Sequence, residues 1–405
     1  MSLMEDFAQV SRFGAGEDGS VERQAAGPAD GEQRRWLCDR LVRAGASVVV
    51  DPVGNIFGLF SWIDGADWVM CGSHLDSQPN GGRYDGAYGV VAAVNAAEQL
   101  NRRVRAGDLV AVRNLVVVDW TNEEGARFQP SVMGSSVHCG LLPMEEALGS
   151  TDASGVTLRE ALSGIGFLGD EEFTGTTVRY AEIHVEQGDR MERQGLDIAA
   201  VSGNWAAGKY DIRITGEQSH TGSTPMPQRR DALVGLARVI AAIDDFARRH
   251  EEQFHASATD VVTFPHSPNV VTSVASAHLE LRSAELDTVL RAERWLEELL
   301  STIAAEYGLT IDVVRRSVRG SDVLWPEGVE LTRSVARSLG FATGELRTIA
   351  GHDAVVVARV MPTVLIFVPS SGGHAHSPKE HTDPADLENG LATLTGVLAE
   401  LTAGY

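Results

Sequence analysis

Four short apolar runs, each followed by or ending in a cluster of acidic residues and histidines, constrain this chain more than any other feature of its sequence. The runs are rich in β-branched residues and read WVMCG (68–72), LVVVDW (115–120), AEIHVE (181–186) and TVLIFVP (363–369). Continuous apolar runs of this length are typical of strands that are buried on both faces of a sheet. Helical patterns lie between them, for example at 88–104. The pattern predicts a layered α/β domain with helices on both faces of a sheet.

The middle of the chain has a different order of elements. From about residue 207 the pattern runs strand, helix, strand, strand, helix, strand, and its strands alternate apolar with polar residues. This is the order of the β-α-β-β-α-β, or ferredoxin-like, sandwich, and the alternation is typical of a sheet with one face open to solvent. We therefore predict a compact domain at 207–324, inserted into a first domain that comprises 1–206 and 325–405.

Composition argues against several kinds of partner. The chain of 405 residues carries a net charge of −22, which disfavours nucleic acid or an anionic membrane. Its three cysteines are scattered and odd in number, so we expect neither a disulfide framework nor a cysteine-rich zinc cluster. Reduced thiols in a cytoplasmic protein are the simplest interpretation. The N-terminus has no pattern of a signal peptide, and no apolar span of 18 residues occurs.

The polar residues that accompany the apolar runs are of the types that bind divalent metals. They are His74 and Asp76, Asp85 in the glycine-rich loop NGGRYDGAYG, Glu123 and Glu124, His184 and Glu186, and His374, His376 and His381. Ligands of open α/β sheets gather beyond the carboxyl ends of the strands, so we expect these side chains to converge. A single histidine or aspartate at a strand end is more often structural, but four such clusters are hard to assign to turns independently. The set contains no thiolate and predicts a catalytic metal site.

Two adjacent carboxylates, Glu123 and Glu124, come directly after a run that reads as a buried strand. At such a position the two side chains repel each other and resist burial. The pair therefore predicts that a cationic group lies nearby.

Seven motifs resemble, in order, those of the hydantoinase/carbamoylase amidohydrolases. This group contains N-carbamoyl-L-amino acid hydrolase, allantoate amidohydrolase and β-ureidopropionase, and it belongs to the aminoacylase-like dinuclear metallopeptidases. The resemblance covers nearly the whole chain. The motifs read GSHLDSQPNGGRYDGAYGV, TNEEGARF, EIHVEQG, SHTGSTPM, PNVV, AGHDA and FVPSSGGHAHSP.

The resemblance implies a site for two divalent metal ions. We expect zinc first, and the imidazole and carboxylate ligands also suit manganese, cobalt or nickel. His74 and His184 would each bind one metal, and Asp85 would bridge the two. Glu124 and His376 would complete the coordination. A histidine at position 184 is typical of the amidohydrolase branch, since related peptidases have an acidic residue there.

The same resemblance implies roles for residues beside the metals. Glu123 would be the general base that acts on water, and Asp76 would orient His74. The family's Ser-His-Asn-Pro reads AHSP here. His374 is therefore a rival to His376, although the register with the following proline favours His376.

For the inserted domain the resemblance implies a lid that also forms a homodimer. His220 in SHTGSTPM would stabilise the oxyanion, and Gln187, Asn269 and Arg282 would bind substrate. The planar guanidinium of Arg282 suits a carboxylate partner. Structural alternatives stay open, because Asn269 could cap a turn and Arg282 could pair with surface acids.

The function that the resemblance implies is metal-dependent hydrolysis of an amide or ureido C–N bond in a small N-carbamoyl-L-amino acid or a related ureido acid. Allantoate or an N-carbamoyl-β-amino acid are alternative substrates. A dipeptidase or an aminoacylase would keep the metal pair and cleave a different amide. A non-catalytic binding protein on the same fold is disfavoured, because every ligand position and both glutamates are present.

Overall fold

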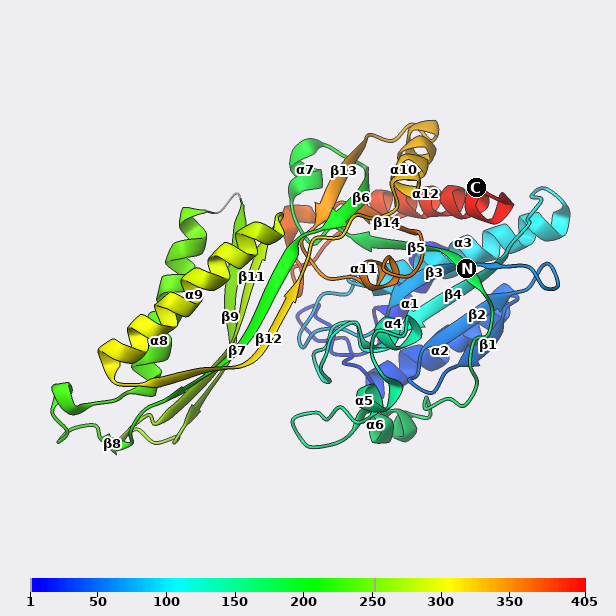
Figure 1. Ribbon diagram of the computed structural model, residues 1–405. Helices are drawn as coiled ribbons and strands as arrows, with labels where there is room; N and C mark the ends of the chain where they lie inside the picture. The colour runs from blue at the N-terminus through cyan, green and yellow to red at the C-terminus, as the bar shows by residue number, and fades with distance from the viewer. Residues whose placement is uncertain (1, 251–252) are drawn as a thin grey trace. The chain divides into compact units, whose positions relative to one another are not determined.

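A computed structural model describes residues 2–250 and 253–405 of the protein (Figure 1). The chain forms two compact units. The first comprises residues 1–202 and 323–405, and the second comprises Gly203–Asp322. The boundaries expected from the sequence, after residues 206 and 324, lie four and two residues further along the chain.

The first unit is built on an eight-stranded sheet in the order β1-β2-β4-β3-β5-β14-β6-β13. The four apolar runs form its centre, where β4, β3, β5 and β14 are parallel neighbours. Antiparallel pairs flank this centre, β1 with β2, β2 with β4, and β14 with β6. The strands are β1 (Ser47–Val50), β2 (Ile56–Phe60), β3 (Trp68–His74), β4 (Asn114–Trp120), β5 (Thr177–Val185), β6 (Ile198–Asn204), β13 (Thr343–Thr348) and β14 (Thr363–Val368).

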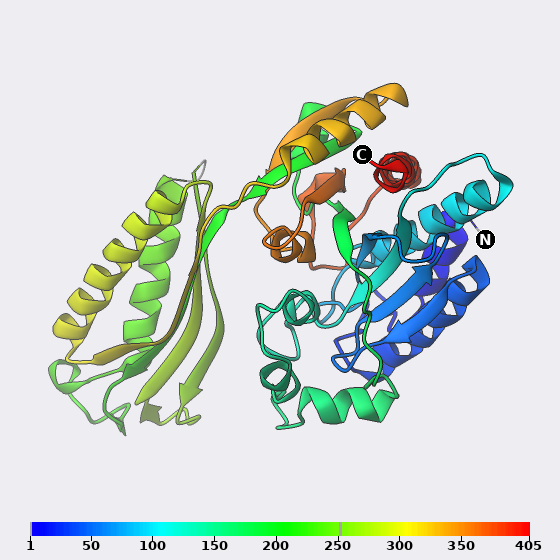
Figure 2. The ribbon, with the colours of Figure 1, turned by 45° about the vertical axis from the view of Figure 1, so that its right-hand side comes forward.

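Helices pack on both faces of this sheet, as the sequence predicted. One face shares a core with α1 (Leu3–Val10), α2 (Pro28–Ala44), α3 (Ala87–Ala106) and α12 (Pro384–Ala403), and Figure 2 views α12 end-on. The other face forms a smaller core with α7 (Arg190–Gln194) and α11 (Asp353–Val357). The remaining helices of the unit are α4 (Met133–His138), α5 (Met144–Leu148), α6 (Leu158–Ile165) and α10 (Pro326–Ser338).

Helix α3 lies unusually close to the sheet. Its alanines and valines between Ala87 and Ala97 are fully buried, and a Cβ at Gly89 would lie only 2.4 Å from the carbonyl oxygen of Ile183 in β5. This close approach needs a residue without a side chain. It fixes the first turn of α3, and the loop that precedes it, beside the ends of β3 and β5.

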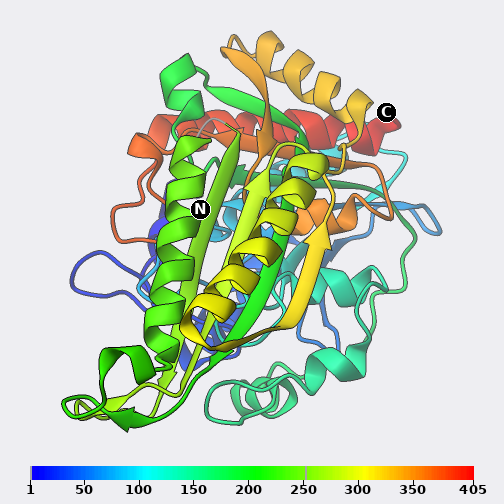
Figure 3. The same ribbon diagram turned by 60° about the vertical axis from the view of Figure 1, so that its left-hand side comes forward.

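The second unit has the predicted β-α-β-β-α-β order. Its antiparallel sheet has the strand order β12-β7-β11-β9, and both long helices pack on one face (Figure 3). The short strands β8 and β10 form a separate pair. The elements are β7 (Ala206–Thr215), β8 (Ser219–His220), α8 (Ala232–Arg249), β9 (Phe254–Phe264), β10 (Val270–Val271), β11 (Val274–Ser283), α9 (Leu286–Tyr307) and β12 (Thr310–Arg319).

The two segments that connect the units run side by side. The backbone N–H of Leu324 donates to the carbonyl of Ser202 at 3.0 Å. The backbone N–H of Asn204 donates to the carbonyl of Asp322 at 3.1 Å, and its side-chain oxygen accepts from Asp322 N–H at 2.9 Å. The chain therefore enters and leaves the second unit at one point. Among the described residues, no helix combines the length and the apolar character needed to cross a membrane.

Candidate metal centre

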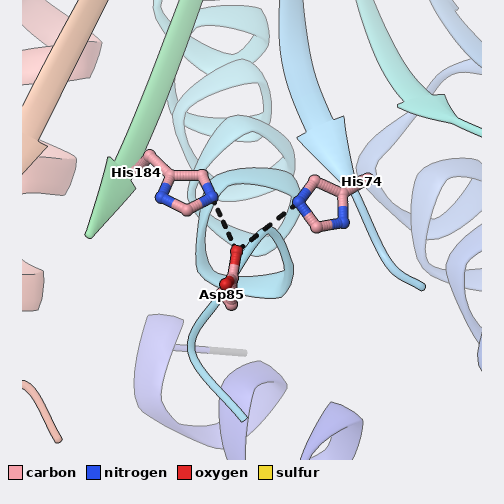
Figure 4. A group of neighbouring side chains, drawn as sticks. All are labelled: His74, Asp85 and His184. Atoms are coloured by element: carbon pink, nitrogen blue, oxygen red, sulfur yellow. Dashed lines mark ion pairs between the residues drawn. The ribbon is translucent and has the colours of Figure 1, made fainter. Parts of the chain in front are cut away.

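The neighbouring parallel strands β3 and β5 end side by side and carry two of the predicted ligands. His74 is the last residue of β3, and His184 is the penultimate residue of β5. Asp85, in the loop before α3, lies between them (Figure 4). Its Oδ1 is 3.0 Å from Nε2 of His184 and 3.6 Å from Nε2 of His74. All three side chains are buried, and their ligand atoms lie close enough together for one ion to take both histidines.

The other oxygen of Asp85 faces a second group. Nε2 of His376 lies 3.1 Å from Asp85 Oδ2 and 3.4 Å from Oε2 of Glu124. Asp85 thus belongs to both groups and presents one oxygen to each, as a bridging carboxylate would. His374 is exposed and belongs to neither group within the described part of the chain.

Hydrogen bonds at the far ring nitrogen turn both buried histidines towards Asp85. Nδ1 of His74 lies 3.0 Å from the backbone oxygen of Asp76, and Nδ1 of His184 lies 2.8 Å from that of Val185. A carbonyl only accepts, so Nδ1 carries the proton and the lone pair of the neutral ring is on Nε2. A lone pair that faces a carboxylate oxygen is repelled unless a proton or a cation lies between them. Metal-ligating histidines are oriented in this way.

The pKa values of the buried groups also indicate that the centre carries an excess of negative charge. Burial raises the pKa of Glu123 well above its usual value, and burial together with Asp85 raises that of Glu124 to about 7. Burial would also raise the pKa of Asp85, yet hydrogen bonds from His184, His376 and His74 hold it well below its usual value. Imidazoles and carboxylates that compete for protons in this way fit two divalent cations, which neutralise the carboxylates without protonation.

Asp76 holds the glutamate pair in place. Its Oδ1 accepts from the backbone N–H of Glu123 at 3.1 Å, and its Oδ2 accepts from that of Glu124 at 3.3 Å. The sequence interpretation gave this carboxylate the task of orienting His74. The backbone carbonyl of Asp76 makes the closer contact with that ring, at 3.0 Å against 3.6 Å for the carboxylate.

The two adjacent glutamates face different groups. Glu124 lies with His376, and its carboxylate accepts from the backbone and the side-chain amide of Gln78 at 3.1 and 2.9 Å. Glu123 lies on the other side, with Oε2 3.6 Å from Nε2 of His74, and it is a member of neither group of three. Only Glu124 of the pair therefore belongs to a group that could hold an ion, and the carboxylate of Glu123 lies beside the centre.

Gln187, expected to bind substrate, reaches the centre itself. Its side-chain amide donates to Asp85 Oδ2 and lies 3.4 Å from Nε2 of His376. Both Gln187 and His376 have left-handed backbones, with φ of 60° and 50°. Such values are uncommon for residues other than glycine, asparagine and aspartate.

In the second unit, His220 and Asn269 lie together. Strand β8 pairs His220 with Val270, and the backbone N–H of Thr221 donates to the carbonyl of Asn269 at 3.3 Å. Nδ1 of His220 accepts from the backbone N–H groups of Gly222 and Ser223 at 2.9 and 3.1 Å. The neutral ring therefore carries its proton on Nε2 and can donate it outward.

Arg282 lies in the four-stranded sheet of the second unit, near the end of β11 that is away from this pair. It is eight residues from Val274, at the start of β11, which corresponds to about 26 Å along a strand. His220 lies beyond that start, on the pair formed by β8 and β10. An Nη atom of Arg282 is 2.9 Å from Oε1 of Glu280, which is also 3.7 Å from Nζ of Lys209. The structure thus brings His220 and Asn269 together and keeps Arg282 apart from them.

Several buried polar residues near the centre were given no role in the sequence interpretation. The ring of His352, within the AGHDA motif, packs edge-on against His184 with centroids 4.5 Å apart. Glu182 is a carboxylate inside an apolar run, which is an unusual pattern that could have identified it. Glu380 follows the last histidine motif without any distinguishing pattern, yet its Oε1 accepts from the backbone N–H of Asp85 at 3.0 Å.

Residues 70–400 match the sequence profile of Peptidase family M20/M25/M40. A relative from Mycolicibacterium smegmatis, named as a hydrolase without a substrate, is 41% identical over 99% of this chain and 93% of its own length. An N-carbamoyl-L-amino-acid amidohydrolase of Rhizobium meliloti is 31% identical, with coverage of 93% and 90%. An allantoate amidohydrolase of Bacillus subtilis is 29% identical, with coverage of 99% and 97%. The crystal structure of a hydantoinase/carbamoylase family amidase from Burkholderia vietnamiensis superimposes with a TM-score of 0.93 at 31% identity, with coverage of 99% and 97%.

The charges of the centre predict how pH affects the metal-free protein. Glu124 and Glu380 have their pKa raised from 4.5 to about 7 by burial, so their contribution to stability is complete below about pH 4.5 and is lost as pH rises to 7. Asp85 and Glu124 raise the pKa of His376 from 6.5 to about 9, because their attraction outweighs the effect of burial. The contribution of His376 to stability is therefore lost as pH rises from about 6.5 to 9. We expect the free energy of unfolding of the chelator-treated protein to fall from about pH 5 to 9 in denaturant titrations.

Addition of Zn²⁺ should stabilise the protein more at the upper end of this range, because ligands must lose their protons to bind a metal. Thermal denaturation with and without Zn²⁺ measures that difference. A metal-free stability that increases over the same range would contradict this account of the centre.

Proposed function

The chain belongs to Peptidase family M20/M25/M40 and, within it, to the hydantoinase/carbamoylase amidases, and we propose that it uses two divalent metal ions to hydrolyse an N-carbamoyl-L-amino acid or a related ureido acid. It is a hydrolase of amide or ureido bonds. The observation that carries the proposal is Asp85, whose two oxygens face two separate groups of imidazole and carboxylate side chains. Water would add to the ureido carbon, and the C–N bond to the amino acid nitrogen would break.

In the proposed reaction Glu123 moves the proton. Two divalent ions, held by the His74 and His376 groups with Asp85 between them, would supply a nucleophile from water near neutral pH and polarise the scissile carbonyl. Glu123 lies beside the His74 group without being part of it, and Asp76 fixes its backbone. Its carboxylate would accept the proton of the attacking water and return it to the departing nitrogen.

His220 is the proposed partner of the oxyanion that forms when water adds. The hydrogen bonds to its Nδ1 support this role, because they leave Nε2–H as a donor and fix the ring. Donors that are fixed before the reaction stabilise developing negative charge most effectively. His220 would act from the second unit, which we propose is a lid.

Arg282 is the proposed partner of the substrate carboxylate. A small ureido acid cannot span the length of β11, so it cannot touch His220 and Arg282 of the same chain at once. If both act on one substrate molecule, they come from two chains. We therefore propose a homodimer in which one chain contributes His220 and Asn269, and the other contributes Arg282.

An exposed surface of the second unit supports the dimer. Strand β9 is an edge of the sheet and exposes Val261, Val262 and Phe264. Beside it a groove of about 620 Å³ lies between α8 and β9, and small and apolar residues that include Ala237 and Ile240 line it. Edge strands with apolar exposure pair readily with another strand. A second copy of this chain is the proposed partner.

Related substrates are the main alternatives. Allantoate, an N-carbamoyl-β-amino acid and ureidoglycolate all have a carboxylate and a ureido group, so the proposed site suits each of them. A dipeptide or an N-acyl amino acid offers the same carboxylate with a different amide. A direct comparison of rates separates these substrates.

We expect a panel of substrates to give the highest kcat/KM for an N-carbamoyl-L-amino acid or another ureido acid, and lower values for N-acyl amino acids and dipeptides. Arg282→Lys should lower kcat/KM almost as much as Arg282→Ala, because lysine cannot hold a carboxylate with a planar pair of donors. A desolvated pair that loses one partner costs about 2–5 kcal/mol. An amide analogue without the carboxylate should react poorly and be little affected by either change. Equal losses on charged and neutral substrates would make Arg282 structural.

The adjacent glutamates should separate in their effects. Glu123→Gln should keep both metal ions and lower kcat by a factor of about 10² to 10⁴, since only proton transfer is lost. Glu124→Gln should instead lower the metal content, because it removes a ligand of the His376 group. Metal analysis combined with kcat tests the assignment. Normal metal content in Glu124→Gln, or loss confined to Glu123→Gln, would reverse the two roles.

Mixed dimers test the shared site. Chains with His220→Ala and chains with Arg282→Ala should each be nearly inactive when alone. After the two are unfolded and refolded together, hybrid dimers should contain one intact site, and activity should recover to roughly a quarter of the wild-type value. Sedimentation should show a dimer. If confirmed hybrid dimers show no recovery of activity, the proposal of a shared site is wrong. His220 and Arg282 would then act in the same chain's site, or one of them would not act on the substrate.

A further inference from the structure

Two buried glutamates outside the predicted ligand set tie together the segments that carry the ligands. We propose that Glu182 and Glu380 are positioning residues, of which Glu182 supports only the ion of the His74–Asp85–His184 group and Glu380 supports both ions through Asp85. The inference rests on the metal pair of the proposed function. It assigns to each glutamate a hydrogen-bonding task that can be separated from its charge.

Glu182 joins three segments beneath the His74 group. Its carboxylate is fully buried in β5, two residues before His184. Oε1 accepts from the hydroxyl of Ser73, the residue next to His74, at 2.9 Å. Oε2 accepts from the backbone N–H of Ala354 at 2.8 Å. These bonds connect β3, β5 and the first turn of α11, which lie far apart in the sequence.

The bond to Ala354 also controls what covers His184. Ala354 is in the first turn of α11, directly after His352 and Asp353. The ring of His352 packs edge-on against His184, at 4.5 Å between centroids, and also contacts Phe367 at 5.4 Å. A carboxylate that holds this turn therefore holds His352 against a predicted ligand. None of these contacts reaches Glu124 or His376, so zinc binding by the His376 group should not depend on Glu182.

Glu380 holds the loop that carries Asp85, the residue that belongs to both groups. It is buried, and its Oε1 accepts from the backbone N–H groups of Tyr84 and Asp85 at 2.7 and 3.0 Å. The contact is close, because a Cβ at Gly82 would lie 2.3 Å from the carboxyl carbon of Glu380. Glu380 is four residues after His376, so it joins the loop that carries Asp85 to the segment that carries His376. Since Asp85 faces both groups, the loss of this tie should affect both ions.

The chain provides a matched control in Glu186. Like Glu182 it is a buried glutamate two residues from His184, on the other side in the sequence. Its carboxylate accepts from the backbone N–H groups of Arg190 and Met191, at 3.1 and 2.8 Å, at the start of α7. Neither of these donors belongs to a segment that carries a predicted ligand. Although the sequence placed Glu186 among the candidate metal-binding residues, it belongs to neither group of three among the described residues, and its carboxylate also accepts from Nε of Arg190 at 3.3 Å. We therefore expect its substitution to disturb α7 and to leave both groups in place.

The substitutions separate hydrogen bonding from charge. Leucine is of similar size and accepts no hydrogen bond, so Glu182→Leu and Glu380→Leu leave buried N–H groups without an acceptor. Glutamine keeps a carbonyl oxygen for the backbone N–H groups, and the Ser73 hydroxyl can accept from its amide. We therefore expect the glutamine variants to bind zinc nearly as the wild type does. Where a leucine variant does not fold, aspartate replaces it, because the shorter side chain draws the carboxylate away from these donors.

The measurement is the zinc affinity of each variant, made in two different parent proteins. Each parent carries one substitution that removes a ligand from one group and leaves the other group intact. His184→Ala removes a ligand of the first group, and Glu124→Gln removes one of the second. Competition with a chelator then gives Kd for the remaining ion. We expect Glu182→Leu to weaken zinc binding about 10 to 100-fold in the Glu124→Gln background and to leave it unchanged in the His184→Ala background. Glu380→Leu should weaken binding in both, and Glu186→Leu in neither.

The outcomes distinguish this inference from the proposed function. A wild-type chain that binds fewer than two zinc ions contradicts the metal pair itself. If the wild type binds two zinc ions, the metal pair stands. The inference alone is then contradicted if Glu182→Leu weakens zinc binding equally in both backgrounds, or if Glu186→Leu weakens it as much as Glu182→Leu does. Glutamine variants that lose zinc as strongly as the leucine variants would show that charge, and not hydrogen bonding, is the contribution of these glutamates. Unchanged zinc affinity in all the leucine variants would overturn the inference outright.

Discussion

The shared carboxylate of Asp85 is the contact around which the first unit is organised. It can face two groups because β4, β3, β5 and β14 are parallel neighbours, so that the segments carrying His74, His184, Glu124 and His376 meet at one edge of the sheet. It is also held at the start of α3, where the partial positive charge of a helix N-terminus favours an anion. The close packing of α3 on β5 at Gly89 keeps that helix end in place. The geometry of the centre therefore depends on backbone packing as much as on its ligands.

The sequence was sufficient to predict the strands that build the site. Short apolar runs rich in β-branched residues are typical of strands buried on both faces, and the parallel order of such strands brings their carboxyl ends together. For this reason His74, Asp85, Glu124, His184 and His376 could be expected to converge, and the structure places them in two groups joined by Asp85. The second unit was predictable from alternation and element order, which are local properties of the chain.

Contacts between distant segments could not be predicted in this way. Glu380 meets Asp85 across nearly three hundred residues, and no local pattern records the backbone N–H groups that it accepts from. The sequence paired Asp76 with His74, its close neighbour, but held no sign that the same carboxylate also accepts from the backbone of the two glutamates after the next strand. Strands β6 and β13 were not predicted as part of the sheet. β13 at its edge is polar and partly exposed, and β6, although buried, reads IAAVSGN and has few β-branched residues. The left-handed backbones of Gln187 and His376 likewise follow from tertiary contacts that override local preference.

The paired connection between the two units suggests how this architecture could arise and change. Asn204 and Asp322 are hydrogen-bonded neighbours, so removal of everything between them would leave a gap that a short turn can close. The inserted unit has its own core, and its first and last strands, β7 and β12, are adjacent in its sheet. Closing a short loop costs little chain entropy, and inserted domains with neighbouring ends are readily tolerated. The second unit is therefore a module that could be gained, lost or exchanged as one block while the hydrolytic unit keeps its fold.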